Sequence, residues 1–172
     1  MLTGSCLCGD ITYTFSGEPI AKALCHCLTC RKFTSSAYAT CFLVPDPDAQ
    51  NSPAETSARK TGFTLQSKTN TPLRQTSTVH ETGMGITFFG CAKCPSTLYK
   101  KAPDGFPGVL VVFAGCLDGS GEGEGEGEGE GELSSAKGGA EELGDPEAEL
   151  WVKYRLPWVK ELKGAKQCQE FE

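Results

Sequence analysis

Short runs in which apolar and polar residues alternate recur along the chain, separated by residues typical of turns. Alternation with a period of two is typical of β-strands that bury one face. No stretch keeps an apolar period of 3.6 residues for more than about two helical turns, so long helices are not expected. The pattern predicts strands at 9–15, 23–27, 37–44, 63–66, 77–82, 109–114 and 149–154, a hairpin at 86–100, and a short helical turn or loop at 28–36.

Two of these runs carry more specific information. The hairpin at 86–100 is predicted to place Cys91 and Cys94 at its tip. The run VLVVFA at 109–114 is apolar at every position, which is typical of a strand buried on both faces. The fold class is therefore predicted to be mostly β, with helical structure confined to short turns.

Two other segments carry almost no large apolar residues. Residues 46–60 are rich in proline and small polar residues and are predicted to form a surface loop. Residues 119–132 are a nearly regular Gly-Glu repeat, whose like charges repel and which has nothing to bury, so a disordered acidic linker is expected. Beyond it, Trp151 and Trp158 are expected to pack the C-terminal segment onto the rest. The chain is thus predicted to be a single domain, 1–172, interrupted by the linker 119–132.

Charge and hydropathy exclude several classes of protein. The 172 residues carry a formal net charge of −6, but six of the 22 acidic residues lie within 121–132. The remaining 16 balance the 16 lysines and arginines, which argues against a nucleic-acid-binding protein. No apolar run approaches the roughly 18 residues that span a membrane, and the first residues, MLTGSCLCGD, do not resemble a secretory signal. A cytoplasmic protein without a membrane partner is expected.

The ten cysteines are the most informative feature of the composition. In a reducing compartment, clustered cysteines indicate metal binding or catalysis rather than disulfides. Seven of the ten are clustered, and the other three are expected to be ordinary buried free thiols. The clusters are Cys6 with Cys8, Cys25 with Cys27 and Cys30, and Cys91 with Cys94, whereas Cys41, Cys116 and Cys168 stand alone.

The pairs Cys6/Cys8 and Cys91/Cys94 are predicted to form one closed four-thiolate zinc site. A Cys-x-Cys pair can chelate only where a strand bends, and Gly9 offers such a bend. A Cys-x-x-Cys pair chelates through a tight turn. The role assigned to this site is structural, because it closes a loop of some 80 residues. The alternative is two unrelated pairs of reduced or redox-active cysteines.

Cys25, Cys27 and Cys30 place three thiols within six residues and leave no fourth cysteine close in sequence. Three protein ligands with an open position are typical of a catalytic zinc site, so these residues are predicted to be catalytic. The ring of His26 is expected to point away from the metal, where it could line the approach to the site. A fourth protein ligand would make the site structural instead, and three side chains are candidates: Cys41, His80 and His26.

Four segments of the chain resemble the glutathione-dependent formaldehyde-activating enzyme family, also called the centromere-protein-V-type domain family. They are GSCLCGDITYTF (4–15), ALCHCLTCRKFTSSAYAT (23–40), FFGCAKCPSTLY (88–99) and VKYRLPWVKELKGAKQ (152–167). The resemblance implies stacked, β-tent-like sheets similar to those of a superfamily of Rab exchange factors and zinc chaperones. It also implies two zinc ions per chain, one structural and one catalytic, on the two ligand sets described above.

The resemblance further implies the reaction. The family adds the thiol of glutathione to formaldehyde to give S-hydroxymethylglutathione, which is a carbon–sulfur lyase step in reverse. Glutathione would be a co-substrate and an aldehyde or thiol adduct the small-molecule partner. Arg31 and Lys32 follow the triad directly and are predicted to attract the carboxylates of glutathione; the alternative is that both are merely solvent-facing charges.

Two other functions remain open at this stage. One is a zinc-dependent lyase or dehydratase of another metabolic pathway. The other is a non-catalytic binding module stabilised by zinc, although the only extension of the chain is acidic and repetitive. The sequence does not indicate the oligomeric state.

Overall fold

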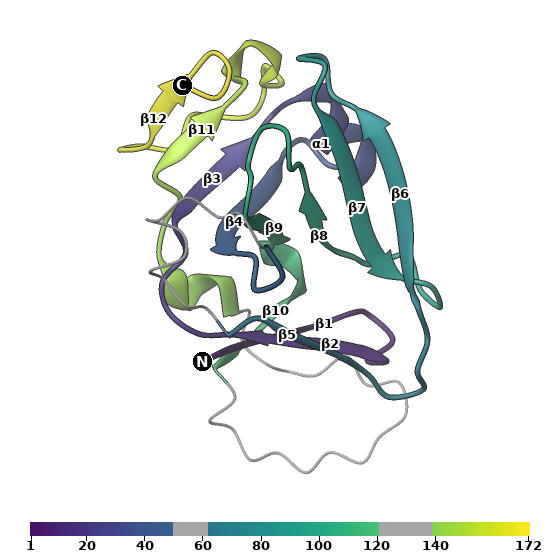
Figure 1. The fold of residues 1–172 in the computed structure, drawn as a ribbon. Helices are drawn as coiled ribbons and strands as arrows, with labels where there is room; N and C mark the ends of the chain where they lie inside the picture. Colours follow the sequence, from purple (N-terminus) through teal and green to yellow (C-terminus); the bar gives the residue numbers. More distant parts are fainter. Residues whose placement is uncertain (50–61, 121–138) are drawn as a thin grey trace.

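A computed structural model describes residues 1–49, 62–120 and 139–172, in which two β-sheets stack on each other (Figure 1). The one α-helix of the described residues has seven residues. The strands are β1 (Leu2–Ser5), β2 (Ile11–Phe15), β3 (Ala21–Cys25), β4 (Ala39–Pro45), β5 (Thr64–Ser67), β6 (Leu73–Val79), β7 (Gly85–Cys91), β8 (Thr97–Lys101), β9 (Val109–Phe113), β10 (Leu117–Ser120), β11 (Ala148–Leu150) and β12 (Lys166–Cys168). The helix is α1 (Leu28–Thr34), and the 3-10 helices are η1 (Ala114–Cys116), η2 (Gly139–Leu143) and η3 (Val152–Tyr154).

The smaller sheet has the strand order β10-β1-β2-β5 and is antiparallel throughout. The larger sheet has the order β12-β11-β3-β4-β9-β8-β7-β6. Its strands pair antiparallel except β11, which runs parallel to both β3 and β12. The mostly β class and the stacked sheets are therefore confirmed, and the three strands β12, β11 and β3 at one end of the larger sheet run parallel to one another.

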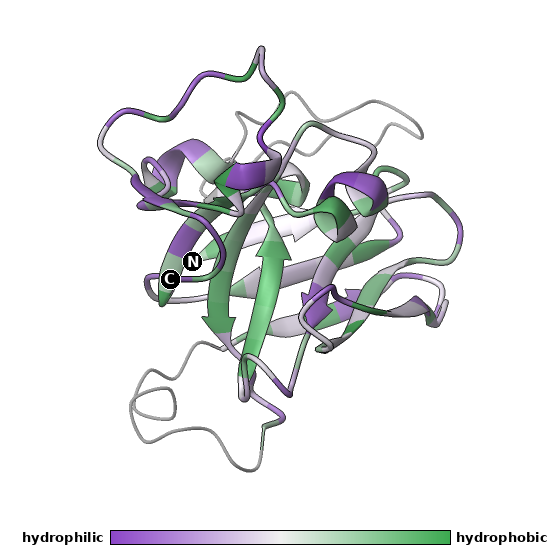
Figure 2. Ribbon diagram, turned by 90° about the horizontal axis from the view of Figure 1, so that it is seen from above, coloured by the Kyte–Doolittle hydropathy of each residue, from purple (hydrophilic) through white to green (hydrophobic). Residues whose placement is uncertain are grey.

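The first core lies between the two sheets. It contains Ile11 and Phe15 of β2 together with Leu110 and Val112 of β9, and all four side chains are almost fully buried. The most hydrophobic strands lie at the centre of the molecule when it is seen from above (Figure 2). Burial of apolar surface at this interface is the main force that holds the sheets together.

A second core covers the opposite face of the larger sheet. Because side chains alternate along a strand, Val111 and Phe113 of β9 point to this face. The prediction that residues 109–114 are buried on both faces is thus confirmed. Helix α1 packs here through Phe33, which stacks on Phe88 of β7 at a ring-centroid distance of 3.5 Å.

The C-terminal segment differs from its prediction. The strand expected at 149–154 ends at Leu150, because Trp151 takes a left-handed backbone conformation with φ of 60° and a 3-10 helix follows. Trp151 is buried as expected, but Trp158 is 74% exposed and does not pack the tail onto the sheets.

Both predicted irregular segments lie mostly outside the described residues. Of the linker 119–132, residues 119 and 120 are described and belong to β10, where Gly119 pairs with Thr3; that boundary was wrong. Residues 121–132 and residues 50–60 of the predicted loop fall outside the described ranges. No helix in the described part of the chain is long and apolar enough to cross a membrane.

Candidate metal centres

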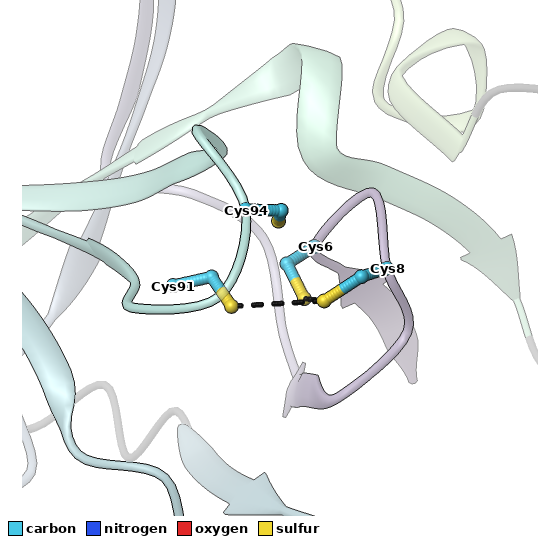
Figure 3. Close-up of side chains that lie close together, drawn as sticks. All are labelled: Cys6, Cys8, Cys91 and Cys94. Carbon is cyan, nitrogen blue, oxygen red and sulfur yellow. Dashed lines mark hydrogen bonds between the residues drawn. The ribbon is translucent and has the colours of Figure 1, made fainter.

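Two loops that are far apart in sequence bring four thiols together (Figure 3). Cys6 and Cys8 lie between β1 and β2, whereas Cys91 ends β7 and Cys94 lies in the turn before β8. The Sγ atoms lie 3.5 Å apart in the pair Cys6/Cys8 and 3.7 Å apart in the pair Cys8/Cys91, and all four lie within 4.8 Å of one another. Sulfur atoms of a tetrahedral zinc site with 2.3 Å bonds are about 3.8 Å apart. The four thiols therefore fit a closed zinc site.

Local backbone geometry orients these thiols towards one another. Gly9 has a φ of +68°, and its N–H donates to the carbonyl of Cys6 at 2.8 Å, so the chain turns back directly after Cys8. This is the bend that the sequence predicted. Two backbone amides donate to sulfur at 3.3 Å, those of Ile11 to Cys6 and of Lys93 to Cys91. Such donors stabilise the thiolate form that binds metal.

The surroundings shift the pKa values of Cys6 and Cys94 in opposite directions. Burial raises the pKa of Cys6 to about 12. Burial also raises the pKa of Cys94, but hydrogen bonds with Ser96 and Cys8 outweigh it and lower that pKa to about 6. Cys94 therefore ionises at a lower pH than Cys6.

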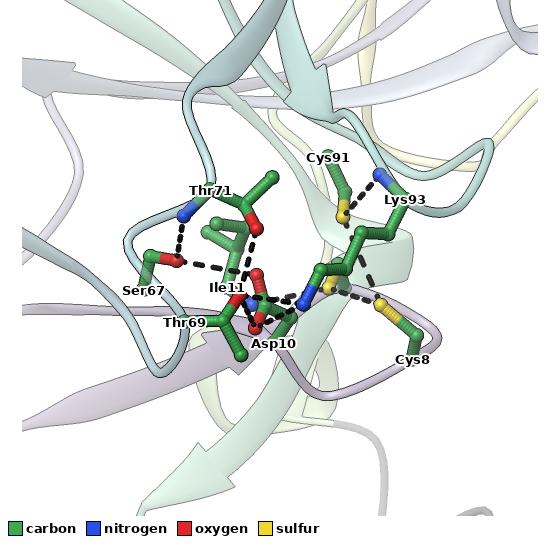
Figure 4. Close-up of polar contacts among 9 residues, drawn as sticks. Cys8, Asp10, Ile11, Ser67, Thr69, Thr71, Cys91 and Lys93 are labelled. Atoms are coloured by element: carbon green, nitrogen blue, oxygen red, sulfur yellow. Dashed lines mark hydrogen bonds and ion pairs between the residues drawn. The ribbon is translucent and has the colours of Figure 1, made fainter.

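A polar network joins the same two loops beside the thiols (Figure 4). The buried carboxylate of Asp10 accepts hydrogen bonds from Thr69 at 2.8 Å, from Lys93 at 3.1 Å and from Ser67 at 3.2 Å. The hydrogen bond from Thr69, together with Lys93, lowers the pKa of Asp10 to about 2. Because Lys93 lies between two of the cysteines, this network holds the two loops together independently of any metal.

The second thiol centre lies on the other face of the larger sheet. Cys25 ends β3, Cys27 is the N-cap of α1, and Cys30 lies one turn into the helix. Their sulfur atoms lie within 4.8 Å of one another, and the Cys27 sulfur accepts the Cys30 N–H at 3.3 Å. We refer to these three residues as the triad. The donor set and the convergence of the sulfurs fit a zinc ion held by three thiolates.

The triad is deeply buried and has a cationic neighbour. Cys25, Cys27 and Cys30 are 3%, 1% and 0% exposed. The ammonium of Lys100 on β8 donates to the Cys30 sulfur at 3.1 Å. Hydrogen bonds from Cys25 and Cys27 hold the pKa of Cys30 well below its usual value. Burial alone would lower the pKa of Lys100, but the neighbouring thiolates, Cys30 first, raise it above its usual value.

The candidates for a fourth ligand lie outside this group. Cys41 is buried beside Cys30, but its sulfur is not among the thiols that lie within 4.8 Å of one another. His26 is not in the group either: it is fully buried, with its Nε2 3.3 Å from the carboxylate of Glu149, and does not line an approach. His80 packs edge-on against Trp151, and its Nδ1 lies 3.0 Å from the hydroxyl of Thr82.

Arg31 and Lys32 are placed differently from each other. The Arg31 guanidinium is partly buried and donates to the carbonyl of Tyr154 at 3.0 Å. Lys32 is exposed. Binding of glutathione carboxylates by these two residues stays a prediction.

The model of the glutathione-dependent formaldehyde-activating enzyme family matches residues 1–128. The chain belongs to this family. The matched residues include all seven clustered cysteines of the two centres. The segment 152–167, which also resembles the family, lies beyond the matched part. A comparison with curated proteins found no match.

Three polar residues that support the centres of this family member were not predicted from the sequence. They are Asp10 beside the four-thiol centre, Lys100 beside the triad, and Glu149, which is fully buried and binds His26, Arg155 and the backbone N–H of Leu162. Nothing in the local sequence marks them, because acidic and basic residues are usually exposed. Only the tertiary structure shows that each is buried next to a thiol centre or its supporting strand.

Proposed function

We propose that the chain catalyses the addition of the glutathione thiol to formaldehyde, with the triad as the reaction centre. The observation that carries the proposal is the convergence of three thiols within 4.8 Å, with no fourth side chain of the described residues in the same group. Three protein ligands leave one position for a substrate. Zinc, when bound, supplies Lewis acidity that favours a thiolate or polarises a carbonyl oxygen. Membership of the family supports the choice of glutathione and formaldehyde.

The proposed addition requires few bond changes. The sulfur of glutathione forms a bond to the carbonyl carbon, the π bond of the carbonyl breaks, and the thiol proton ends on the new hydroxyl oxygen. No electron is gained or lost overall, so no oxidant or reductant is needed. Cys25, Cys27 and Cys30 hold the reacting centre, and their burial keeps water away from it. The reverse reaction is a carbon–sulfur lyase step.

The other assignments follow from the same reasoning. We assign a structural zinc to the four-thiol centre, which gives two zinc ions per chain. All ten cysteines are free thiols, which favours a reducing compartment such as the cytoplasm.

The burial of the triad favours a second candidate, a non-catalytic module with two closed zinc sites. A centre whose three sulfurs are at most 3% exposed is well protected from solvent. The two candidates differ in one property, because an enzyme must admit a thiol to the triad and a closed module need not.

One experiment separates them. Zinc per chain is measured on purified, reduced protein before and after dialysis against glutathione, and the rate of S-hydroxymethylglutathione formation is compared with the spontaneous rate. Loss of one of two zinc ions, together with a rate enhancement that Cys27→Ser abolishes, supports the enzyme. Two zinc ions that never exchange, together with the spontaneous rate, refute the enzyme and favour the closed module.

A further inference from the structure

Lys100 occupies a position in the sheet where an apolar residue is expected. In the register of the strands it lies opposite Phe88 of β7 and Val111 of β9, which are 1% and 3% exposed. Lys100 itself is 8% exposed. The next residue, Lys101, points to the other side of the strand and forms an ion pair with Asp46 at 2.7 Å. Two adjacent lysines therefore have opposite environments, one at the protein surface and one inside the second core.

A buried ammonium group requires a counter-charge, because removing it from water without one costs several kcal/mol. No carboxylate within the described residues lies at ion-pair distance from the Lys100 ammonium. Its hydrogen-bond partner is the sulfur of Cys30 at 3.1 Å. A neutral thiol would leave the ammonium without a counter-charge. The Lys100 ammonium therefore has a counter-charge only when the triad is anionic.

The charges of the centre can be counted. Three thiolates carry −3, and a divalent ion reduces this to −1. The ammonium of Lys100 brings the total to zero. A substrate thiolate that enters the centre then leaves a total of −1, whereas without Lys100 it would leave −2 in a site from which water is excluded.

We propose that Lys100 is a positioning residue of the triad, whose ammonium balances the charge of the metal-bound thiolates and so allows a further thiolate to enter. The entry of a further thiolate rests on the proposed function. The role differs from that predicted for Arg31 and Lys32, because Lys100 acts on the ligand sulfur and not on the carboxylates of glutathione. The hydrogen bond to Cys30 also fixes the direction of that sulfur, as supporting groups around metal ligands do.

The test uses Co²⁺ as the probe, because thiolate ligation of Co²⁺ has an absorption signature. The variants are Lys100→Met, which removes the charge and the donor, Lys100→Gln, which removes the charge and keeps a donor, and Lys100→Arg, which keeps both. Lys101→Met is the matched control. The spectrum of Cys27→Ser is subtracted, so that the difference reports on the triad alone. Affinity for Co²⁺ is measured by competition with a chelator.

The expected result is a loss of about 10- to 100-fold in the affinity of the triad for Co²⁺ in Lys100→Met and Lys100→Gln. The thiolate absorption band of the triad should shift in both variants, and the four-thiol centre should keep its metal. Lys100→Arg should retain most of the affinity, and Lys101→Met should equal wild type. The rise in melting temperature on adding metal should shrink only in the uncharged variants of Lys100.

Wild-type affinity and an unshifted band in Lys100→Met would overturn the proposal. So would failure of both uncharged variants to fold in the absence of metal, because Lys100 would then be needed whatever the charge of the triad. Addition of glutathione to the Co²⁺-loaded wild type separates the two proposals. An unchanged spectrum would refute thiolate entry, and with it the proposed function, while a loss of metal affinity in the variants would still establish the charge-balancing role.

Discussion

The two thiol centres should differ in how strongly each stabilises the fold. Cys8 and Cys91 are 83 residues apart in sequence, so a metal that joins them closes a long loop. Applying the chain-entropy relation for cross-links to 83 residues gives a stabilisation of about 4.5 kcal/mol. Cys25 and Cys30 are only five residues apart, for which the same relation gives about 2 kcal/mol. The free energy of unfolding should therefore depend mainly on the four-thiol centre.

Two serine substitutions compare the centres. Cys91→Ser removes a ligand with no solvent exposure, and we expect it to lower the free energy of unfolding by about 4–5 kcal/mol in the zinc-loaded protein. A loss of this size is a large part of the 5–15 kcal/mol typical of a domain. Cys27→Ser should lower it by at most about 2 kcal/mol, because serine can keep the N-cap hydrogen bond to the N–H of Cys30.

The assay is equilibrium urea unfolding of the reduced, zinc-loaded wild type and both variants at one fixed free zinc concentration. Each protein is then unfolded again in excess chelator. The difference between wild type and Cys91→Ser should almost disappear in chelator, because the wild type then lacks the cross-link as well. Equal losses in the two variants, or a Cys91→Ser loss that persists in chelator, would refute the division into a structural and a catalytic centre.

Three further substitutions test other parts of the structure. A hydrogen bond from Thr69 lowers the pKa of Asp10 to about 2, so the ionised carboxylate contributes fully to stability above a pH of about 4, and this contribution is lost as the pH falls towards 2. Asp10→Asn should abolish this acid dependence in melting curves. An unchanged acid dependence in the variant would contradict the assignment. Gly90→Ala places a Cβ against the carbonyl oxygen of Ser96 and should cost about 1–3 kcal/mol in urea unfolding, whereas wild-type stability would show that the turn can move. Glu149→Gln should cost about 3 kcal/mol and expose the C-terminal segment to trypsin, and unchanged digestion would count against its anchoring role.

Most of the strands could be predicted because their alternation is local. The hairpin with Cys91 and Cys94 at its tip is confirmed, and of the helical turn or loop expected at 28–36 the structure forms the helix, α1, over Leu28–Thr34. Strands β1, β10 and β12 were not predicted, since runs of three or four residues carry too little pattern to separate from loops. The end of β11 was misplaced because the left-handed backbone of Trp151 depends on its packing and not on its neighbours in sequence.

The candidate centres could be predicted only in part, for a related reason. Cysteine spacing is a local property, and it was enough to group the seven thiols as the structure groups them. Asp10, Lys100 and Glu149 were missed because each has a partner that lies far away in the sequence: Thr69, Cys30 and His26 respectively. A lysine two residues from Leu98 gives no sign, by itself, of which face of the strand it occupies.

That face is decided by an irregularity in the hairpin of β7 and β8. The register between the two strands shifts between Phe89 and Gly90, which leaves Leu98 without a regular partner. In a regular strand, Leu98 and Lys100 would share a face. Here Leu98 and Tyr99 both join the first core, while Lys100 faces the second. The bulge therefore lets one hairpin serve both centres, because it supplies Cys91 to the four-thiol centre on one side of the sheet and Lys100 to the triad on the other.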